Sequence, residues 1–523
     1  MKKSTRRIAL ALTLVLLFSF TLFACSNEST TSSGTNATTA VPTQTTSSTA
    51  KKVFRYGYPE NVQFWDPADN FNIVSYTLEN CIYDTLVRYD PEDGKFLPSV
   101  ATEWSTQDAS VWNFKLRNDI TFHNGEKLNA SSVKGTIERF LTEKTLRRGS
   151  DWKQLVGVDI VNDYEINLKF SSPVGTCLNT LCFTPIIPFE TFKKLGKDLF
   201  NNPIGSGPFK FTETAKDQYV ILSKNDAYWG EKAKVDQIKY LPIMEDSTRV
   251  AGLQTGDLDA VAIIPSDQVP TLSKDTNLDI VTMGAVDQIY LGFKCDQAPF
   301  NDIKAREAVS LAIDREMIAT GLFSAARAAT CGIPEGCIGF DPSYPAIKRD
   351  VAKAKQLLSE SSYSGETIQV ILPLGWYSKT QDVGQMIQAN LQEIGMKVNM
   401  QYLEGAAFAE KRAAGNYQIY YTGASFVGYN PDSFYFQRVH DDAMKTGYVN
   451  EILNAAIVKS RAAPTIEERV AQYKIMMDEM LKQTAPHTYI YQQEVIYGKR
   501  KNVTGIVFTR DRVVDLRYVD FSN

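Results

Sequence analysis

The sequence is poor in the residues that metal-dependent and nucleophilic catalysis use. Its 523 residues include only three histidines, His123, His440 and His487. No His-Glu-x-x-His helix, phosphate-cradling glycine loop, Gly-x-Ser-x-Gly elbow or dinucleotide-binding glycine fingerprint occurs. Because no catalytic set can be named, we expect a protein that is not an enzyme and that needs no cofactor.

Positive charge and long apolar runs are also scarce. The chain has 56 basic and 60 acidic residues, and four of the basic residues lie in an N-terminal segment without acids. Removal of that segment leaves a net charge of about −8, the wrong sign for a nucleic-acid-binding protein. No later run is long and apolar enough to cross a bilayer. The 43% of hydrophobic residues are therefore expected to fill the core of a soluble globular body.

Cysteine is infrequent as well, with seven in the chain. Two pairs are close in sequence, Cys177 with Cys182 and Cys331 with Cys337, and such pairs can oxidise outside the cytoplasm. Neither pair has the Cys-x-x-Cys spacing of a zinc site. The sequence leaves disulfide pairing open.

The N-terminus has the features of an export signal. Four basic residues precede an apolar run over residues 8–23, followed by Ala24 and Cys25. Residues 22–25 resemble a lipobox, in which the signal peptide, here 1–24, is removed and the cysteine is acylated. A transmembrane helix is the alternative, but the run is shorter than the ~20 residues that a span needs. We expect Cys25 to be the lipid-attachment site that anchors the protein to a membrane.

Residues 25–50 are expected to form a linker. Fifteen of the 25 residues from Ser26 to Ala50 are serine or threonine, so the segment has too little apolar surface to fold. The protein is then expected outside the cytoplasm, lipid-anchored to the outer face of the cell membrane.

Hydrophobic periodicity predicts a βαβ unit in the C-terminal half. Residues 368–372 form an apolar strand, a helix follows from Thr380 to Gly395, and residues 396–400 alternate as the next strand. Such a crossover is right-handed and joins parallel strands. Two further helices are predicted over residues 130–141 and from Thr465, where Thr465-Ile466-Glu467-Glu468 has the capping-box pattern.

Six sequence blocks follow one another in the order of a known family. Behind a lipobox, they make the chain similar to the extracytoplasmic solute-binding proteins of peptide- and nickel-type ABC importers, over the whole mature chain. The blocks are Leu97–Trp104, Phe114–Gly125, Gly205–Phe209, Asn225–Glu231, Leu253–Asp259 and Ala298–Arg315.

The resemblance implies an α/β, two-lobed periplasmic-binding-protein-like fold of the large peptide-binding type, with an extra subdomain in the first lobe. The lobes are expected to close like a hinge about crossover strands near 290–293 and 488–491. The implied bounds are 51–88, 203–288 and 494–523 for the first lobe, 89–202 for the extra subdomain and 289–493 for the second lobe.

The resemblance also implies where ligand is bound. Trp65 belongs to a first-lobe segment that lines the family's cleft, and Trp376 and Tyr377 are expected to face it from the second lobe. A ligand-contacting loop near residues 422–434 adds Thr422, Ser425, Phe426, Val427 and Tyr429.

This loop departs from the peptide-binding branch of the family. Alignment of Asn430-Pro431-Asp432 with that branch puts Val427 where an aspartate usually pairs with the peptide's α-ammonium, and Ala424 where a tryptophan usually stands. A buried ammonium without a counter-charge is strongly disfavoured. The ligand therefore stays open between a peptide-like molecule and a metal chelate.

Three residues resemble the nickel-type branch instead. Arg148 and Trp152 lie near a matching pair of that branch, in which arginine suits carboxylates and tryptophan covers a ligand face. His440 follows the ligand loop, as does the histidine that reaches the metal in nickel-type members, so we expect it to contact metal through a bound chelate. The alternatives are a surface role for Arg148, a core position for Trp152 and an ordinary loop position for His440.

Together these features predict the lipid-anchored solute-binding component of an ABC importer. It is expected to act as a monomer that captures a small-molecule ligand and delivers it to the permease, while the ATPase subunits act inside the cell. Two alternatives stay open: a ligand-sensing receptor of the same fold without transport, and a secreted hydrolase.

Overall fold

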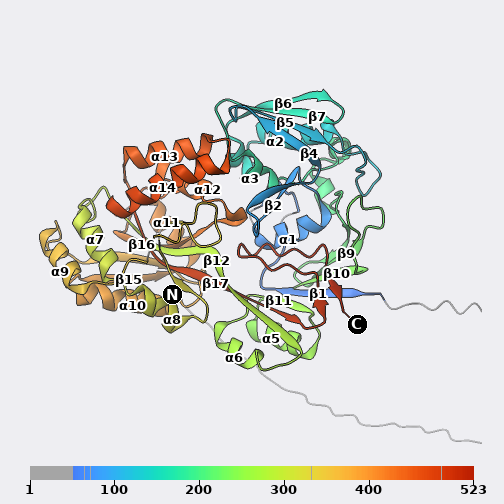
Figure 1. Cartoon of the computed structure of the whole chain (residues 1–523). Coiled ribbons are helices and arrows are strands. Elements are labelled where there is room, and N and C mark those ends of the chain that lie inside the picture. The colour runs from blue at the N-terminus through green and yellow to red at the C-terminus, as the bar shows by residue number, and fades with distance from the viewer. Residues whose placement is uncertain are drawn as a thin grey trace, which may run out of the picture. The chain divides into compact units, whose positions relative to one another are not determined.

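The computed structural model describes residues 51–522 apart from 64, 71, 331, 345, 484 and 485. The predicted signal peptide, the linker and Cys25 lie outside the described residues. Within the described part of the chain, no helix has the length and apolar character needed to span a membrane. The described residues belong to one unit that is built around a large mixed sheet (Figure 1).

The large sheet has eleven strands, ten of them in the order β15-β14-β16-β12-β17-β11-β1-β10-β9-β8, with β13 paired to β17. Pairing is parallel between β14 and its neighbours and between β1 and its neighbours, and antiparallel elsewhere. In chain order the strands are β1 (Val53–Tyr58), β8 (Phe209–Ala215), β9 (Tyr219–Lys224), β10 (Gln237–Pro242), β11 (Ala260–Ala262), β12 (Leu278–Phe293), β13 (Arg327–Ala328), β14 (Ile368–Pro373), β15 (Val398–Leu403), β16 (Ile419–Ser425) and β17 (His487–Arg500).

The long strands β12 and β17 connect the two halves of this sheet. Residues 278–284 of β12 pair with residues 494–500 of β17, and residues 288–293 pair with β16 and with the start of β17. The register shifts between Gly284 and Gln288, and such an irregularity bends the strands locally. The predicted crossover segments lie in these two strands, on the β16 side of the shift.

A second, four-stranded antiparallel sheet has the order β4-β5-β7-β6, with bounds β4 (Ala101–Thr106), β5 (Val111–Leu116), β6 (Leu155–Asn162) and β7 (Glu165–Phe170). In β5, Trp112, Phe114 and Leu116 are buried and alternate with more exposed residues. The predicted helix over residues 130–141 is α2 (Ala130–Thr142), and it shares a hydrophobic core with this sheet. The separate core fits the expectation of an extra subdomain, whose bounds stay a prediction.

The predicted βαβ unit is present. β14, α10 (Thr380–Glu393) and β15 follow one another, and the two strands are parallel. Buried residues at helical spacing, among them Val383, Ile387 and Leu391, hold α10 on the sheet. Gly395 follows the helix with a φ of 91°, a conformation that glycine adopts without strain.

The predicted capping box is also present. The Thr465 hydroxyl accepts a hydrogen bond from the Glu468 N–H, and the Glu468 carboxylate accepts one from the Thr465 N–H. It opens α14 (Ile466–Gln483), which packs against α13 (Glu451–Ala462). Figure 1 shows this helix pair, orange to red, beside α3 (Cys177–Cys182).

The remaining elements cover the sheets and connect them. They are α1 (Ile73–Ile82), β2 (Val87–Asp90), β3 (Lys95–Pro98), η1 (Arg147–Trp152), α4 (Phe189–Leu195), η2 (Gly196–Asn201), α5 (Asp246–Thr255), η3 (Ser266–Gln268), α6 (Val269–Leu272), α7 (Ile303–Ala312), α8 (Arg315–Leu322), α9 (Val351–Glu360), α11 (Gly405–Ala413), η4 (Val427–Tyr429), α12 (Asp432–Tyr435), η5 (Phe436–His440), β18 (Val503–Thr504) and β19 (Asp520–Phe521).

The cysteines are thiols in the described part of the chain. Cys177 and Cys182 lie at the two ends of α3 and are both free, so the structure contains no disulfide between them. Cys337 is free and buried, and Cys331 lies outside the described residues.

Candidate ligand-binding site

A cavity of about 650 Å³ lies between two walls that come from distant parts of the chain. The first wall is formed by residues of α1, η1 and α3, together with Arg512 near the C-terminus. The second wall is formed by residues between 423 and 438, from the end of β16 through η4 and α12 to η5. A cavity of this size between two walls is typical of a small-molecule site.

The first wall is held in place by a helix cap and aromatic packing. The Asn72 side chain accepts a hydrogen bond from the Val74 N–H at 3.0 Å and so caps the start of α1. Tyr76 of α1 meets the ring of Phe183, just after α3, edge-on with centroids 5.2 Å apart. Both residues line the cavity, so α1 and α3 present one continuous surface.

The second wall depends on a close approach at Gly428. Its φ is 73°, and a Cβ atom there would lie 2.4 Å from the ring of Phe183 on the first wall. Only glycine combines this backbone conformation with this distance. The Gly428 N–H also donates to a carboxylate oxygen of Asp511 at 3.1 Å, which ties the second wall to the C-terminal segment.

Tyr377 supports the second wall from behind. Its hydroxyl accepts a hydrogen bond from the Gly423 N–H at 2.8 Å and lies 3.0 Å from the Thr422 hydroxyl. Gly423 lines the cavity, so Tyr377 orients the end of β16.

Positive charge predominates around the cavity. Four arginines, Arg147, Arg148, Arg438 and Arg512, line it together with a single carboxylate, Asp151. The Nε of Arg148 is 3.5 Å from the Asp151 carboxylate. In the part of the chain that the structure describes, Arg438 belongs to no ion pair, and its Nη1 lies 2.8 Å from the sulfur of Met444. The cavity therefore suits an anionic solute.

Three predicted contact residues line the cavity: Arg148, Ser425 and Val427. Arg148 is 3% exposed, so it is a buried charge at the wall and not a surface residue.

Four others lie directly behind the second wall. Thr422 and Tyr377 form the hydrogen-bonded support described above, and Phe426 packs into the core, where it meets Phe434 edge-on. Tyr429 lines a smaller adjoining cavity. These four position the wall.

The remaining predicted residues are away from the cavity. Trp65 packs edge-on against Phe211 in the core of the β1 half of the sheet. Trp152 stacks on Phe140 and is 3% exposed, which is the core position that was its alternative. Trp376 packs against Phe408 and is largely exposed. None of the three tryptophans reaches the cavity, because each is held by a packing partner of its own.

His440 is also placed elsewhere. Its ring stacks on Phe436, and its Nδ1 is 2.9 Å from an Asp441 oxygen. Within the described ranges, no group of three or more histidine, cysteine, aspartate or glutamate side chains could hold a metal ion. The predicted metal contact through a chelate is therefore not supported by a side chain at the cavity.

Several wall residues were not predicted from the sequence, above all Arg438, Arg512, Asp151 and Tyr76. Arg438 lies only two residues before His440, in a region that the resemblance had marked. No motif surrounds Arg512, and its place at the cavity depends on the path of the C-terminal segment.

Two smaller cavities adjoin the main one. A cavity of about 160 Å³ shares Phe183 and Gly428 with it, and one of about 240 Å³ shares residues such as Ser150 and Gln437. Together they make room for an extended solute.

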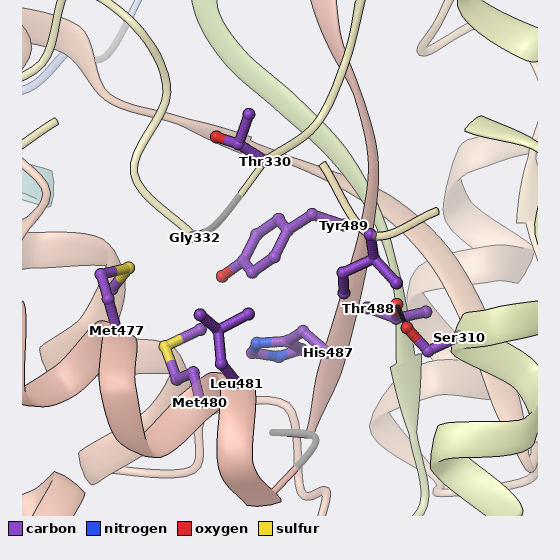
Figure 2. A pocket seen from close by; sticks show the side chains of 10 residues that line it. Ser310, Thr330, Gly332, Met477, Met480, Leu481, His487, Thr488 and Tyr489 are labelled. Atoms are coloured by element: carbon purple, nitrogen blue, oxygen red, sulfur yellow. Dashed lines mark hydrogen bonds between the residues drawn. The ribbon is translucent and has the colours of Figure 1, made fainter. Parts of the chain in front are cut away.

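A separate cavity of about 40 Å³ lies at His487, beside Met477, Met480 and Leu481 (Figure 2). Burial, and to a smaller extent the positive charge of Arg438, lower the pKa of the His487 imidazole to about 3. Both ring nitrogens are buried without a hydrogen-bond partner among the described residues. This histidine is therefore a neutral core residue.

Beside the cavity, α3 and the residues just before it contact α13, α14 and the segment between them. The Gly175 N–H donates to the Arg461 carbonyl at 2.8 Å, and Arg469 donates to the Asn179 side chain at 2.7 Å. A Cβ at Gly175 would lie 1.6 Å from the Ala463 carbonyl oxygen. These contacts hold the two walls together at one edge.

Comparison with known proteins places this geometry in context. The family model described as "Bacterial extracellular solute-binding proteins, family 5 Middle" matches residues 95–446. The glutathione-binding protein GsiB of Salmonella choleraesuis is 26% identical over 456 residues, covering 84% of this chain and 89% of that protein.

Solved structures share the fold. CtaP of Listeria monocytogenes, an ABC transporter substrate-binding protein, superimposes with a TM-score of 0.81 at 23% identity, covering 90% of this chain and 100% of that one. NikA of Brucella suis, solved in complex with Fe(III)-EDTA, gives a TM-score of 0.80 at 22% identity with the same coverage. The fold is thus the expected two-lobed periplasmic-binding-protein type.

Proposed function

Because the chain belongs to family 5 of the bacterial extracellular solute-binding proteins of ABC importers, we propose that it captures a small peptide-like or metal-chelate solute in the 650 Å³ cavity and delivers it to a permease. The observation that carries this proposal is the cavity itself. Its two walls come from segments that are far apart in the chain, and they meet where Gly428 faces Phe183. Enclosure between such walls removes a solute from water and lets groups of both walls reach it.

Two observations support a solute of this kind. The relative GsiB is a glutathione-binding protein, and glutathione is a modified tripeptide with two carboxylates. The Fe(III)-EDTA complex of NikA indicates that the fold accommodates a metal polycarboxylate. Fe(III)-EDTA has no ammonium group and therefore needs no aspartate at the position of Val427, which lines the cavity with an apolar side chain.

The membrane anchor and the delivery of solute to a permease are proposed from the sequence. The lipid on Cys25 anchors the protein to the outer face of the membrane, and the linker lets the monomeric binding unit move above it. There the protein presents solute to the permease, and ATPase subunits on the inner side drive transport.

Native mass spectrometry of the purified protein tests the proposal. A panel of glutathione, ordinary dipeptides, a nickel–histidine complex and Fe(III)-EDTA is expected to contain at least one solute that binds at one molecule per chain. Substitution of Val427 by tryptophan, which fills the cavity, is expected to abolish that binding. Binding that survives this substitution would place the site elsewhere. Turnover of a panel member would contradict a pure binding function.

A further inference from the structure

We propose that the solute carries at least two anionic groups, one held by Arg148 on the first wall and one by Arg438 on the second. This inference rests on the proposed function and specifies the solute class of the same cavity. It selects carboxylate-rich solutes, such as acidic peptides or metal polycarboxylates, over zwitterionic dipeptides.

Arg148 is a buried cation with unused donors. Its side chain is 3% exposed, and its Nε and Nη1 atoms have no hydrogen-bond partner among the described residues. The ion pair with Asp151 at 3.5 Å is longer than a hydrogen bond, and the guanidinium also lies 6.0 Å from the ring centroid of Tyr76. A buried charge with unpaired donors is costly unless another group completes its bonding. An anionic group of the solute would do so.

Arg438 presents a second cation from the opposite wall. No carboxylate of the described residues pairs with it, and its Nη1 faces the weakly accepting sulfur of Met444 at 2.8 Å. Its positive charge is felt through the core, where it lowers the pKa of His487. A guanidinium in this position can bind a carboxylate through two parallel hydrogen bonds.

The charges of the other two cavity arginines are partly neutralised by nearby carboxylates. Arg512 lies 2.7 Å from the Asp287 carboxylate, and Arg147 lies 4.0 Å from that of Asp69. Arg147, Arg148 and Arg512 thus each lie near a carboxylate, whereas Arg438 has none nearby in the described part of the chain. The excess positive charge favours a solute with a net negative charge, and the placement of Arg148 and Arg438 on different walls favours two separate anionic groups.

Isothermal titration of a matched set of solutes tests the inference. Glutathione has two carboxylates, and Fe(III)-EDTA has several. Glutathione ethyl ester has only one of glutathione's two carboxylates. Alanyl-cysteinyl-glycine is similar in size to glutathione and also has one carboxylate. The solutes with several carboxylates are expected to bind at least about tenfold more tightly than their one-carboxylate partners, and less tightly as salt is added.

Arg438→Gln supplies the second arm. Arg438 is partly exposed and has no ion pair, so this variant is expected to fold, and to lose about tenfold or more in affinity for the polycarboxylates. Arg412→Gln is the matched control, because Arg412 is also partly exposed, lies in α11 beside β14 and β15, and does not line the cavity. Its affinities are expected to equal those of the parent.

The outcomes separate this inference from the proposed function. Equal affinity for one-carboxylate and polycarboxylate solutes, or an Arg438→Gln variant that binds as tightly as the parent, overturns the two-anion inference and leaves solute binding intact. Failure of every solute, zwitterionic peptides included, contradicts both.

Discussion

Replacement of His487 by phenylalanine is expected to remove part of the protein's instability in acid. The imidazole is 3% exposed, and its pKa is lowered from the ordinary value of 6.5 to about 3. Below pH 6.5 the unfolded chain protonates this histidine while the folded chain keeps it neutral, so the unfolded state binds more protons. The contribution of the neutral His487 imidazole to the free energy of unfolding is therefore complete above pH 6.5, and it is lost as the pH falls toward 3.

The surroundings of His487 explain why the folded state resists protonation. The ring faces Tyr290 with centroids 4.5 Å apart, Phe434 at 5.9 Å and Tyr489 at 6.3 Å. The charged group that acts on it is Arg438, which is itself positive. No described residue accepts a hydrogen bond from either ring nitrogen, and the charge of Arg438 repels an imidazolium.

The size of the effect follows from the displaced pKa. One pH unit corresponds to about 1.4 kcal/mol for one proton, so a fall from about pH 7.5 to about pH 5 costs about 2 kcal/mol through His487. The full displacement is worth about 5 kcal/mol and is reached only below about pH 3. His123, whose pKa burial lowers to about 4, adds a similar slope in parent and variant alike, and this cancels in the comparison.

Urea denaturation at the two pH values measures the difference. The His487→Phe variant is expected to gain about 2 kcal/mol relative to the parent as the pH falls from about 7.5 to about 5. Tyr489→Phe is the control, because it alters the same aromatic cluster without removing a group that titrates in acid. An unchanged pH dependence in the His487 variant would refute the reasoning.

Three further predictions concern the walls and their supports. In Gly175→Val the new Cβ would lie 1.6 Å from the Ala463 carbonyl oxygen, so the two walls are expected to separate. Solute affinity, measured by titration, is then expected to fall about tenfold or more. Gly321→Ala is the control and leaves the affinity unchanged. Thr465→Ala removes the cap of α14 and is expected to lower the free energy of unfolding by about 1 kcal/mol, measured by urea denaturation; no change would show that the capping box is not formed. Trp376→Ala is expected to leave solute affinity within about twofold of the parent, since this side chain packs on α11 away from the cavity, and a large loss would return Trp376 to the site.

Short-range patterns predicted the local elements well. The parallel pair β14 and β15 and the helix between them follow from hydrophobic periodicity, and the start of α14 follows from a four-residue capping pattern. The order of motif blocks was sufficient for the family and the two-lobed fold. The same information placed Arg148, Ser425 and Val427 at the cavity. The three tryptophans that it marked lie away from this cavity, because an aromatic residue packs equally well into a core or a cleft.

By itself, the sequence determined the elements, the family and the loop that forms the second wall, since each depends on residues that are neighbours in the chain. Only the tertiary structure decided which charges meet. Three cavity arginines come from distant parts of the chain: Arg148 from η1, Arg438 from η5 and Arg512 from the C-terminal segment. They share one cavity because β12 and β17 join the two halves of the sheet and so bring the walls together. Such an encounter is set by packing across the whole fold, and no local pattern of residues encodes it.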